Sequence, residues 1–97
     1  MPTVMFPYKT LLFEWDTDKY EKVREKHGIA FEEACSVFFD IYEITYADSR
    51  FDEMRYVTIG MSDLARLLVI AWTQRNENIR LITAMKAEKS HEQRYRR

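Results

Sequence analysis

The chain has 97 residues and a mass of 11.8 kDa, enough for one domain. Its 46% hydrophobic and 32% charged residues, with only two Gly and two Pro, exclude a low-complexity, collagen-like or disordered protein. The formal net charge of −1, taken alone, argues against a nucleic-acid binder. By position, however, residues 1–63 carry 13 acidic and 7 basic side chains, a net of −6, and residues 64–97 carry 3 acidic and 8 basic, a net of +5. A fold that keeps these halves apart presents a cationic face to phosphates or to an acidic partner, whereas a fold that mixes them presents none.

The cysteine and histidine content excludes several kinds of site. A single cysteine, Cys35, forms neither an internal disulfide nor a Cys-type zinc site. The two histidines, His27 and His91, lie far apart outside any metal-binding motif, so we expect no metal or other cofactor. The longest apolar run, residues 67–72, is far shorter than the roughly 20 residues that span a bilayer. Residues 1–7 lack the pattern of a signal peptide, so we expect a cytoplasmic protein.

The first predicted elements in chain order are an arm, a strand and a helix. Residues 1–10 contain both prolines, which favours an extended or loose N-terminal arm. Residues 11–15 are predicted to form a short strand. A helix is expected over residues 17–27, because Asp16 is a suitable N-cap and Gly28 can adopt the left-handed conformation that ends a helix.

A second helix, four strands and a third helix follow. Apolar residues at helical spacing predict one buried stripe on the second helix: Phe31, Ala34, Cys35 and Phe38. After Asp40 the apolar period falls to two, which predicts strands at residues 42–46, 57–61, 67–72 and 79–86. The tail from Ala87 is expected to be helical. This order predicts an α+β domain over residues 11–97, with two N-terminal helices on a four-stranded antiparallel sheet, a short N-terminal strand and a C-terminal helix.

Basic side chains gather in and beside the last two predicted strands, at Arg66, Arg75, Arg80 and Lys86. Arg80 and Lys86 are six residues apart, an even number, so we expect them on one face of their strand. Guanidinium groups bind phosphate bidentately and stabilise the dianionic transition state of phosphodiester cleavage. Metal-free RNA cleavage can use the ribose 2′-hydroxyl as nucleophile, with a base and an acid from the protein. The alternative is that these are solvated charges that protect a sheet edge from aggregation.

An ordered set of motifs between Leu12 and Tyr95 resembles the BrnT family of toxins from bacterial type II toxin–antitoxin systems. The motifs are Phe13-Glu-Trp-Asp16, Lys19, Lys26-His27-Gly28-Ile29, Phe31-Glu-Glu-Ala34, Arg55-Tyr56, Ile59-Gly60, Arg66-Leu-Leu-Val69, Thr73, Arg75, Ile79-Arg80-Leu-Ile82, Ala84, Lys86-Ala87 and Tyr95. The resemblance implies a RelE-like fold and a ribonuclease that cleaves RNA and arrests translation until a cognate antitoxin binds. It also implies a ribbon-helix-helix antitoxin, through which alone the toxin contacts operator DNA.

The candidate site residues follow from this resemblance and from the charge pattern. Arg80, Arg66 and Arg75 are expected to bind and stabilise the scissile phosphate, and proton transfer is expected from Lys86, His27 or Tyr95. Further RNA contacts are expected from four basic side chains on the helices: Lys19, Lys26, Lys89 and Arg94. Tyr95 equally suits docking of the last helix through its ring.

Three positions depart from the family pattern and keep alternatives open. Val23 stands where the family often has Asn, Met85 where it often has Arg, and His91 where Glu is common. Because Met85 removes a cation beside the proposed site, a non-catalytic toxin relic that serves complex formation and autoregulation is one alternative. The other is a toxin of the same fold that acts on a protein target such as gyrase.

Overall fold

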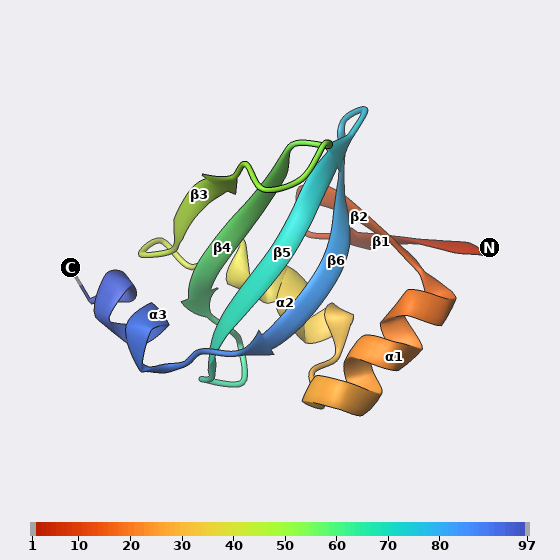
Figure 1. Cartoon of the computed structure of the whole chain (residues 1–97). Coiled ribbons are helices and arrows are strands. Elements are labelled where there is room, and N and C mark those ends of the chain that lie inside the picture. Colours follow the sequence, from red (N-terminus) through yellow and green to blue (C-terminus); the bar gives the residue numbers. More distant parts are fainter. Residues whose placement is uncertain (1, 97) are drawn as a thin grey trace.

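A six-stranded sheet forms the centre of this computed structural model, which describes residues 2–96 (Figure 1). The strands are β1 (Thr3–Tyr8), β2 (Leu11–Asp16), β3 (Ile44–Asp48), β4 (Arg55–Met61), β5 (Leu67–Arg75) and β6 (Asn78–Lys86). The helices are α1 (Thr17–His27), α2 (Phe31–Val37) and α3 (Lys89–Tyr95). Across the sheet the strand order is β1-β2-β6-β5-β4-β3, and every neighbouring pair is antiparallel except β2 and β6.

The prediction of an α+β fold is confirmed, but the prediction of a four-stranded sheet is wrong. Most of the expected N-terminal arm is strand β1, which pairs with β2 along its whole length, from Thr3 opposite Asp16 to Tyr8 opposite Leu11. Strand β2 in turn joins β6 in parallel, with Glu14 opposite Arg80. A proline within β1 is tolerated because β1 is an edge strand, where one side of the backbone needs no ladder partner.

Helix α1 begins and ends at the residues predicted for it. The Asp16 side chain accepts a hydrogen bond from the Asp18 N–H at 2.9 Å, and Gly28 adopts a φ of 72°. The Gly28 N–H donates to the Arg24 carbonyl, which completes the C-terminal cap. The helix is mostly solvated, and Val23 is its buried residue.

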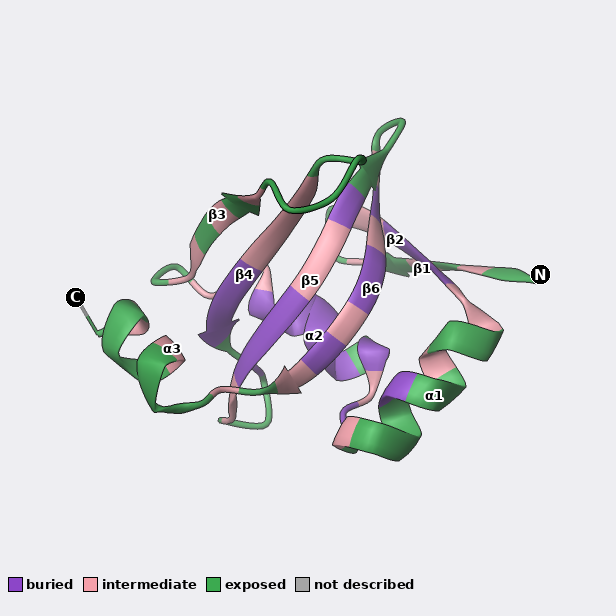
Figure 2. Ribbon diagram, viewed as in Figure 1, coloured by how far each residue is buried: buried purple, intermediate pink, exposed green. Residues whose placement is uncertain are grey.

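Helices α1 and α2 cover one face of the sheet, which we call the helix-covered face (Figures 1 and 2). The core there joins Phe13 and Trp15 of β2 to Phe31 of α2 and to Leu68 and Ile70 of β5. The predicted stripe of α2 lies in this core, although the helix ends at Val37, one residue before Phe38. Cys35 is fully buried in the same core, which raises the pKa of its thiol to about 12.

The opposite face of the sheet, which we call the open face, carries a single helix of residues 2–96, α3, which lies at one end beside β3 and β4 (Figure 1). Helix α3 has no buried residue. The Tyr95 hydroxyl donates to Asp40 Oδ2 at 2.6 Å, and the Arg94 guanidinium lies 3.9 Å from the centre of the Tyr46 ring. The helix starts at Lys89, so Ala87, which was expected to be helical, precedes it.

A β-bulge in the β5–β6 hairpin changes which side chains share a face. Ala71 lies opposite Thr83 and Trp72 opposite Leu81, so Ile82 between them has no partner on β5. The bulge shifts the alternation by one residue. From one side of Ile82 to the other, side chains of β6 therefore lie on the opposite faces of the sheet from those that strict alternation predicts.

The expectation that Arg80 and Lys86 share a face is therefore wrong. Arg80 pairs with Thr73 on the open face, whereas Lys86 pairs with Leu68, a core residue of the helix-covered face.

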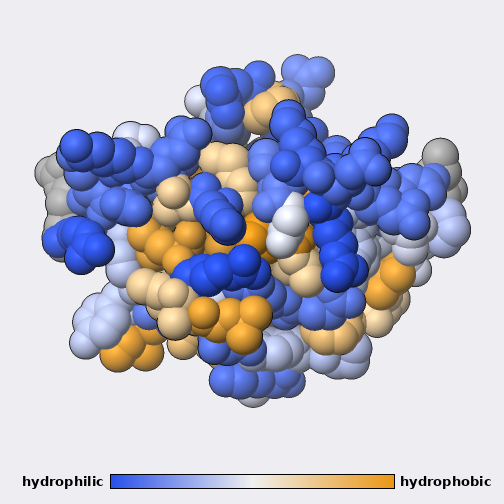
Figure 3. Space-filling view, turned by 90° about the horizontal axis from the view of Figure 1, so that it is seen from below, coloured by the Kyte–Doolittle hydropathy of each residue, from blue (hydrophilic) through white to orange (hydrophobic). Residues whose placement is uncertain are grey.

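The surface mixes polar and apolar regions. Large apolar side chains that remain exposed include Ile41, Tyr42, Met61 and Leu64. Seen from below, an apolar area lies among hydrophilic residues near the centre of the molecule (Figure 3). Within residues 2–96 no helix has the length and apolarity needed to cross a membrane.

Candidate active site

A small pocket of about 200 Å³ brings four cationic side chains together from four elements. They are Lys19 of α1, Arg55 of β4, Arg75 of β5 and Arg80 of β6. The tight β5–β6 turn places Arg75 opposite Asn78 and Thr73 opposite Arg80, which brings two of the four to one end of the sheet. Asp16 and Glu53 supply acidic side chains at the same pocket.

Arg80 is held in place by a carboxylate on the neighbouring strand. Its Nη1 donates to Glu14 Oε1 at 2.7 Å, and Asn78 Nδ2 donates to Glu14 Oε2 at 3.1 Å. Burial alone would raise the pKa of Glu14, but the hydrogen bonds from Asn78 and Arg80 lower it, so the carboxylate is ionised at neutral pH. Glu14 accepts a hydrogen bond from one terminal nitrogen of Arg80, so the other N–H groups of this guanidinium remain for a ligand.

Arg75 lies at the mouth of the same pocket in a more solvated pair. Its Nε donates to Glu53 Oε2 at 3.3 Å, and 48% of the Arg75 side chain and 45% of the Glu53 side chain are exposed. An exposed ion pair of this kind contributes little to the stability of the fold, so Arg75 can leave Glu53 and bind another anion at little cost.

Arg55 is a cation of the open face that sequence reasoning did not place in the site. Its cross-strand neighbour is Asp48, but Asp48 binds Arg50 instead, with Oδ1 accepting from Nε at 2.8 Å and Oδ2 from Nη2 at 2.6 Å. This pairing lowers the pKa of Asp48 to about 2. Among residues 2–96, Arg55 forms no ion pair, and its buried Nε has no hydrogen-bond partner. The guanidinium carbon lies 3.9 Å from the centre of the Phe51 ring.

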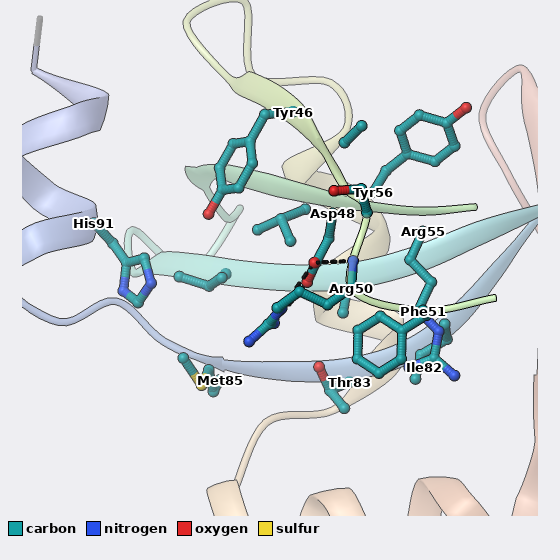
Figure 4. A pocket seen from close by; sticks show the side chains of 15 residues that line it. Tyr46, Asp48, Arg50, Phe51, Arg55, Tyr56, Ile82, Thr83, Met85 and His91 are labelled. Atoms are coloured by element: carbon teal, nitrogen blue, oxygen red, sulfur yellow. Dashed lines mark hydrogen bonds and ion pairs between the residues drawn. The ribbon is translucent and has the colours of Figure 1, made fainter. Parts of the chain in front are cut away.

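A large pocket of about 550 Å³ adjoins the small one on the open face, and Arg55 and Ile82 line both (Figure 4). Its floor is largely apolar and consists of Val57, Val69, Ala71, Ile82 and Met85. Its walls carry aromatic, charged and polar side chains: Tyr46, Asp48, Arg50, Phe51, Arg55, Thr83 and His91. Figure 4 shows the Phe51 ring beside Arg55 at one end, and His91 of α3 at the other.

His91 is held in place by a backbone hydrogen bond at the start of α3. Its Nδ1 accepts a hydrogen bond from the Glu88 N–H at 3.0 Å, which completes a capping box with the Glu88 side chain. The neutral ring therefore carries its proton on Nε2, which leaves an N–H donor on the far side of the ring.

The structure places the other predicted catalytic residues away from these pockets. Arg66 binds Glu33 through two nitrogens, one of them Nε at 3.0 Å, and Glu33 also accepts from Ser62 at 2.6 Å. Arg66 precedes β5 and Arg75 ends it, so about 30 Å of extended strand separates them.

Proton transfer was expected from three residues that do not line either pocket. Lys86 lies at the far end of β6 on the helix-covered side, and His27 is the last residue of α1. The Tyr95 hydroxyl donates a hydrogen bond to Asp40, and burial together with this carboxylate raises the pKa of Tyr95 to about 12. The docking role considered for Tyr95 was through its ring, whereas the contact that it makes with Asp40 is through its hydroxyl.

Of the four expected RNA contacts, Lys19 lines the small pocket, and Arg94 packs on Tyr46 at the edge of the large one. Lys26 and Lys89 are exposed and line neither pocket. In the described part of the chain, no three His, Cys, Asp or Glu side chains are grouped so as to hold a metal ion.

Comparisons with known proteins identify the family to which the chain belongs. A family model described as "Ribonuclease toxin, BrnT, of type II toxin-antitoxin system" matches residues 15–91, which leaves β1 outside the match. No curated protein matches the chain. The fold is similar to the crystal structure of the ribonuclease toxin BrnT from Brucella abortus, with a TM-score of 0.54 and 17% identity over 77% of this chain and 94% of that one. Because the family model covers well over half of the sequence, the chain belongs to the BrnT family of ribonuclease toxins of type II toxin–antitoxin systems.

Proposed function

We propose that this protein is a metal-independent endoribonuclease that cleaves cytoplasmic RNA and thereby arrests translation. The observation that carries the proposal is the convergence of Lys19, Arg55, Arg75 and Arg80 on one small pocket of the open face. Membership of a ribonuclease toxin family supports the same activity. A phosphodiester that enters this pocket contacts several of these cationic side chains at once.

The geometry of the pocket suits phosphate binding and transition-state stabilisation. Arg80 is fixed by Glu14 with 20% of its side chain exposed, so its remaining N–H groups are oriented before a ligand arrives. Arg75 exchanges its exposed pairing with Glu53 for a phosphate oxygen. Preorganised donors of this kind stabilise the extra negative charge of the pentacoordinate transition state without reorganisation.

The chemistry proceeds through the ribose 2′-hydroxyl, which attacks the adjacent phosphorus and displaces the 5′-oxygen of the next nucleotide. We assign acceptance of the 2′-hydroxyl proton to Glu53 and protonation of the leaving oxygen to Lys19, because both side chains line the small pocket. The products are a 2′,3′-cyclic phosphate and a 5′-hydroxyl. We prefer these two residues to Lys86, His27 and Tyr95, which were expected to transfer protons but line neither pocket.

The test is cleavage of labelled RNA by purified protein in the presence of EDTA, with product ends mapped. We expect cyclic phosphate ends, and we expect Arg80→Ala to lower kcat/KM about 100-fold or more, in the range seen when one oxyanion donor is removed. Lys22→Ala is the matched control, because Lys22 is an exposed cation of α1 outside both pockets. Unchanged RNA with wild-type protein, or equal cleavage by Arg80→Ala, would contradict the proposal.

One observation favours a second candidate function, the non-catalytic relic. Met85 lines the large pocket at the position where the family pattern often has arginine, so one cation is missing there. A relic binds its antitoxin without toxicity. Expression without antitoxin separates the two: growth arrest with RNA cleavage supports the ribonuclease, whereas co-purification with a small partner and no arrest supports the relic. Growth arrest with DNA damage signalling and intact transcripts supports a protein target such as gyrase instead.

The family also supports a proposal about partners. We propose that a cognate antitoxin, with a ribbon-helix-helix part that alone contacts operator DNA, covers the cationic pocket through an acidic surface. Co-expression with the cognate antitoxin is expected to abolish RNA cleavage and to give a complex that binds operator DNA, whereas the toxin alone is expected not to bind it.

A further inference from the structure

We propose that the large pocket of the open face is a nucleobase-binding subsite that receives the base next to the phosphate held in the small pocket. This inference rests on the proposed function and adds to it the part of the RNA that is recognised. Four features of the large pocket support it: its size, its apolar floor, its aromatic walls and an unpartnered cation at the junction with the small pocket.

The size and lining of the large pocket match a nucleobase. Its volume of about 550 Å³ lies within the range of about 300–1,000 Å³ that is typical of small-molecule sites. A planar base buries its faces on apolar and aromatic groups and directs its polar edge to donors and acceptors. Val69, Ala71 and Met85 supply an apolar floor, and Phe51 and Tyr46 supply aromatic rings on the walls.

The aromatic rings are already oriented for stacking by cations. The Arg55 guanidinium packs against Phe51 at 3.9 Å, and Arg94 packs against Tyr46 at the same distance. Phe51 is 43% exposed, so part of its side chain is open to a ligand. The Arg50 guanidinium also lies over the Phe51 ring, at 5.5 Å from its centre. A base that stacks on Phe51 therefore takes the place of Arg50 or packs beside it, and stacking of this kind tolerates any base.

Arg55 connects the two pockets. It lines both, it forms no ion pair among the described residues, and its Nε is buried without a partner. Because the Nε atom is closed to solvent, the guanidinium is the part of Arg55 that a ligand meets. An anion that pairs with it offsets the cost of a cation that is otherwise unpaired among the described residues. A nucleotide meets this requirement, because its phosphate and its base are joined by one ribose and span adjacent subsites.

Polar groups around the floor provide recognition of the base edge. The Arg50–Asp48 pair leaves Arg50 N–H groups free on one wall, and Thr83 and His91 Nε2–H lie elsewhere on the rim. These groups are mostly donors, so a base with acceptors on its exposed edge is favoured over one with donors.

The experiment is an NMR titration of the labelled full-length protein with each of the four nucleoside 5′-monophosphates and with ribose 5-phosphate, which lacks the base. We expect at least one nucleotide to bind about 10-fold more tightly than ribose 5-phosphate, as expected for one stacked base. The nucleotide should shift amides of residues 49–54 and of α3, whereas ribose 5-phosphate should shift only those around residues 75–80.

Variants separate the two subsites. Phe51→Leu keeps an apolar side chain without a stacking surface, and we expect it to remove most of the nucleotide's advantage while leaving ribose 5-phosphate binding unchanged. Arg80→Ala is expected to weaken both ligands equally. Tyr42→Leu is the control, because Tyr42 is a 70% exposed aromatic outside the pocket, and it should bind both ligands as the wild type does.

The outcomes distinguish the base pocket from the proposed function. Equal affinity for nucleotides and ribose 5-phosphate, or a full nucleotide advantage in Phe51→Leu, overturns the base pocket alone. Failure of the wild-type protein to bind any of the phosphates, together with intact RNA in the cleavage assay, overturns the proposed function. A base preference next to the cut that persists in Phe51→Leu would also contradict the pocket, since we expect this variant to relax that preference.

Discussion

The contact between Tyr95 and Asp40 should control how firmly α3 closes one end of the open face. Helix α3 has seven residues and none of them is buried. A helix this short is not stable by itself in water, so its order depends on tertiary contacts. Tyr95→Phe removes one hydroxyl that donates to Asp40 at 2.6 Å and keeps the ring. We expect this variant to leave the core intact and to release α3 more often.

The magnitude follows from the surroundings of Asp40. A hydrogen bond to a charged group contributes about 1.5–3 kcal/mol. Here Asp40 keeps the Met61 N–H at 2.8 Å and the Tyr42 N–H at 3.0 Å, and the site is partly exposed to solvent. Solvent screening and the two remaining donors bring the loss below this range, to about 1 kcal/mol. This corresponds to about a fivefold larger population of undocked α3.

Amide hydrogen exchange measures this population directly. In Tyr95→Phe we expect the protection of α3 amides to fall about fivefold, while the amides of β5 keep their protection. Tyr42→Phe is the control, because it makes the same chemical change at a tyrosine that is 70% exposed. Unchanged protection of α3 in Tyr95→Phe, or equal loss in both variants, would refute the docking role.

Three further predictions concern stability. Gly60→Ala should destabilise the fold by about 1–3 kcal/mol, because a Cβ at this position meets Val37 Cγ1 at 2.8 Å. Gly28→Ala should cost about 1 kcal/mol through its φ of 72° alone, since a Cβ there meets no atom within 4 Å; denaturant unfolding measures both. The hydrogen bonds from Arg66 lower the pKa of Glu33 in the folded protein, although burial opposes this. The ionised carboxylate therefore stabilises the fold at a pH above the ordinary pKa of glutamate. This stabilisation is lost as the pH falls through the lowered pKa. Thermal unfolding at decreasing pH should show this loss, and Glu33→Gln should reduce its slope; an equal slope would contradict the assignment.

Local signals in the sequence located the helices well. The ends of α1 match the prediction because Asp16 and Gly28 act within one turn of the backbone they cap. The stripe beginning at Phe31 identified the buried side of α2 for the same reason. Such signals depend only on residues that are close in the sequence, so the local structure that they predict does not depend on how distant segments pair.

The sheet and the site depend on contacts between distant residues, which the sequence reveals poorly. The parallel pairing of β2 with β6 joins Glu14 to Arg80, 66 positions apart, and no local pattern indicates it. The bulge at Ile82 contains neither glycine nor proline, so the alternation argument placed Lys86 on the wrong face. Arg55 was overlooked because its lack of a partner results from Asp48 binding Arg50 instead. The available signal was the Arg55-Tyr56 pair among the motifs that the chain shares with the BrnT family.

The central claim is that RNA is cleaved at the cations of the open face, and Arg80 and Lys86 test it most directly. They are six residues apart on β6, but the bulge places them on opposite faces of the sheet. The measurement is kcat/KM for RNA cleavage by Arg80→Ala and Lys86→Ala, each checked for an unchanged thermal unfolding temperature. We expect Arg80→Ala to lose about 100-fold or more and Lys86→Ala to retain activity within about twofold of the wild type. Equal losses in the two variants, or a larger loss in Lys86→Ala, would contradict the placement of the active site on the open face.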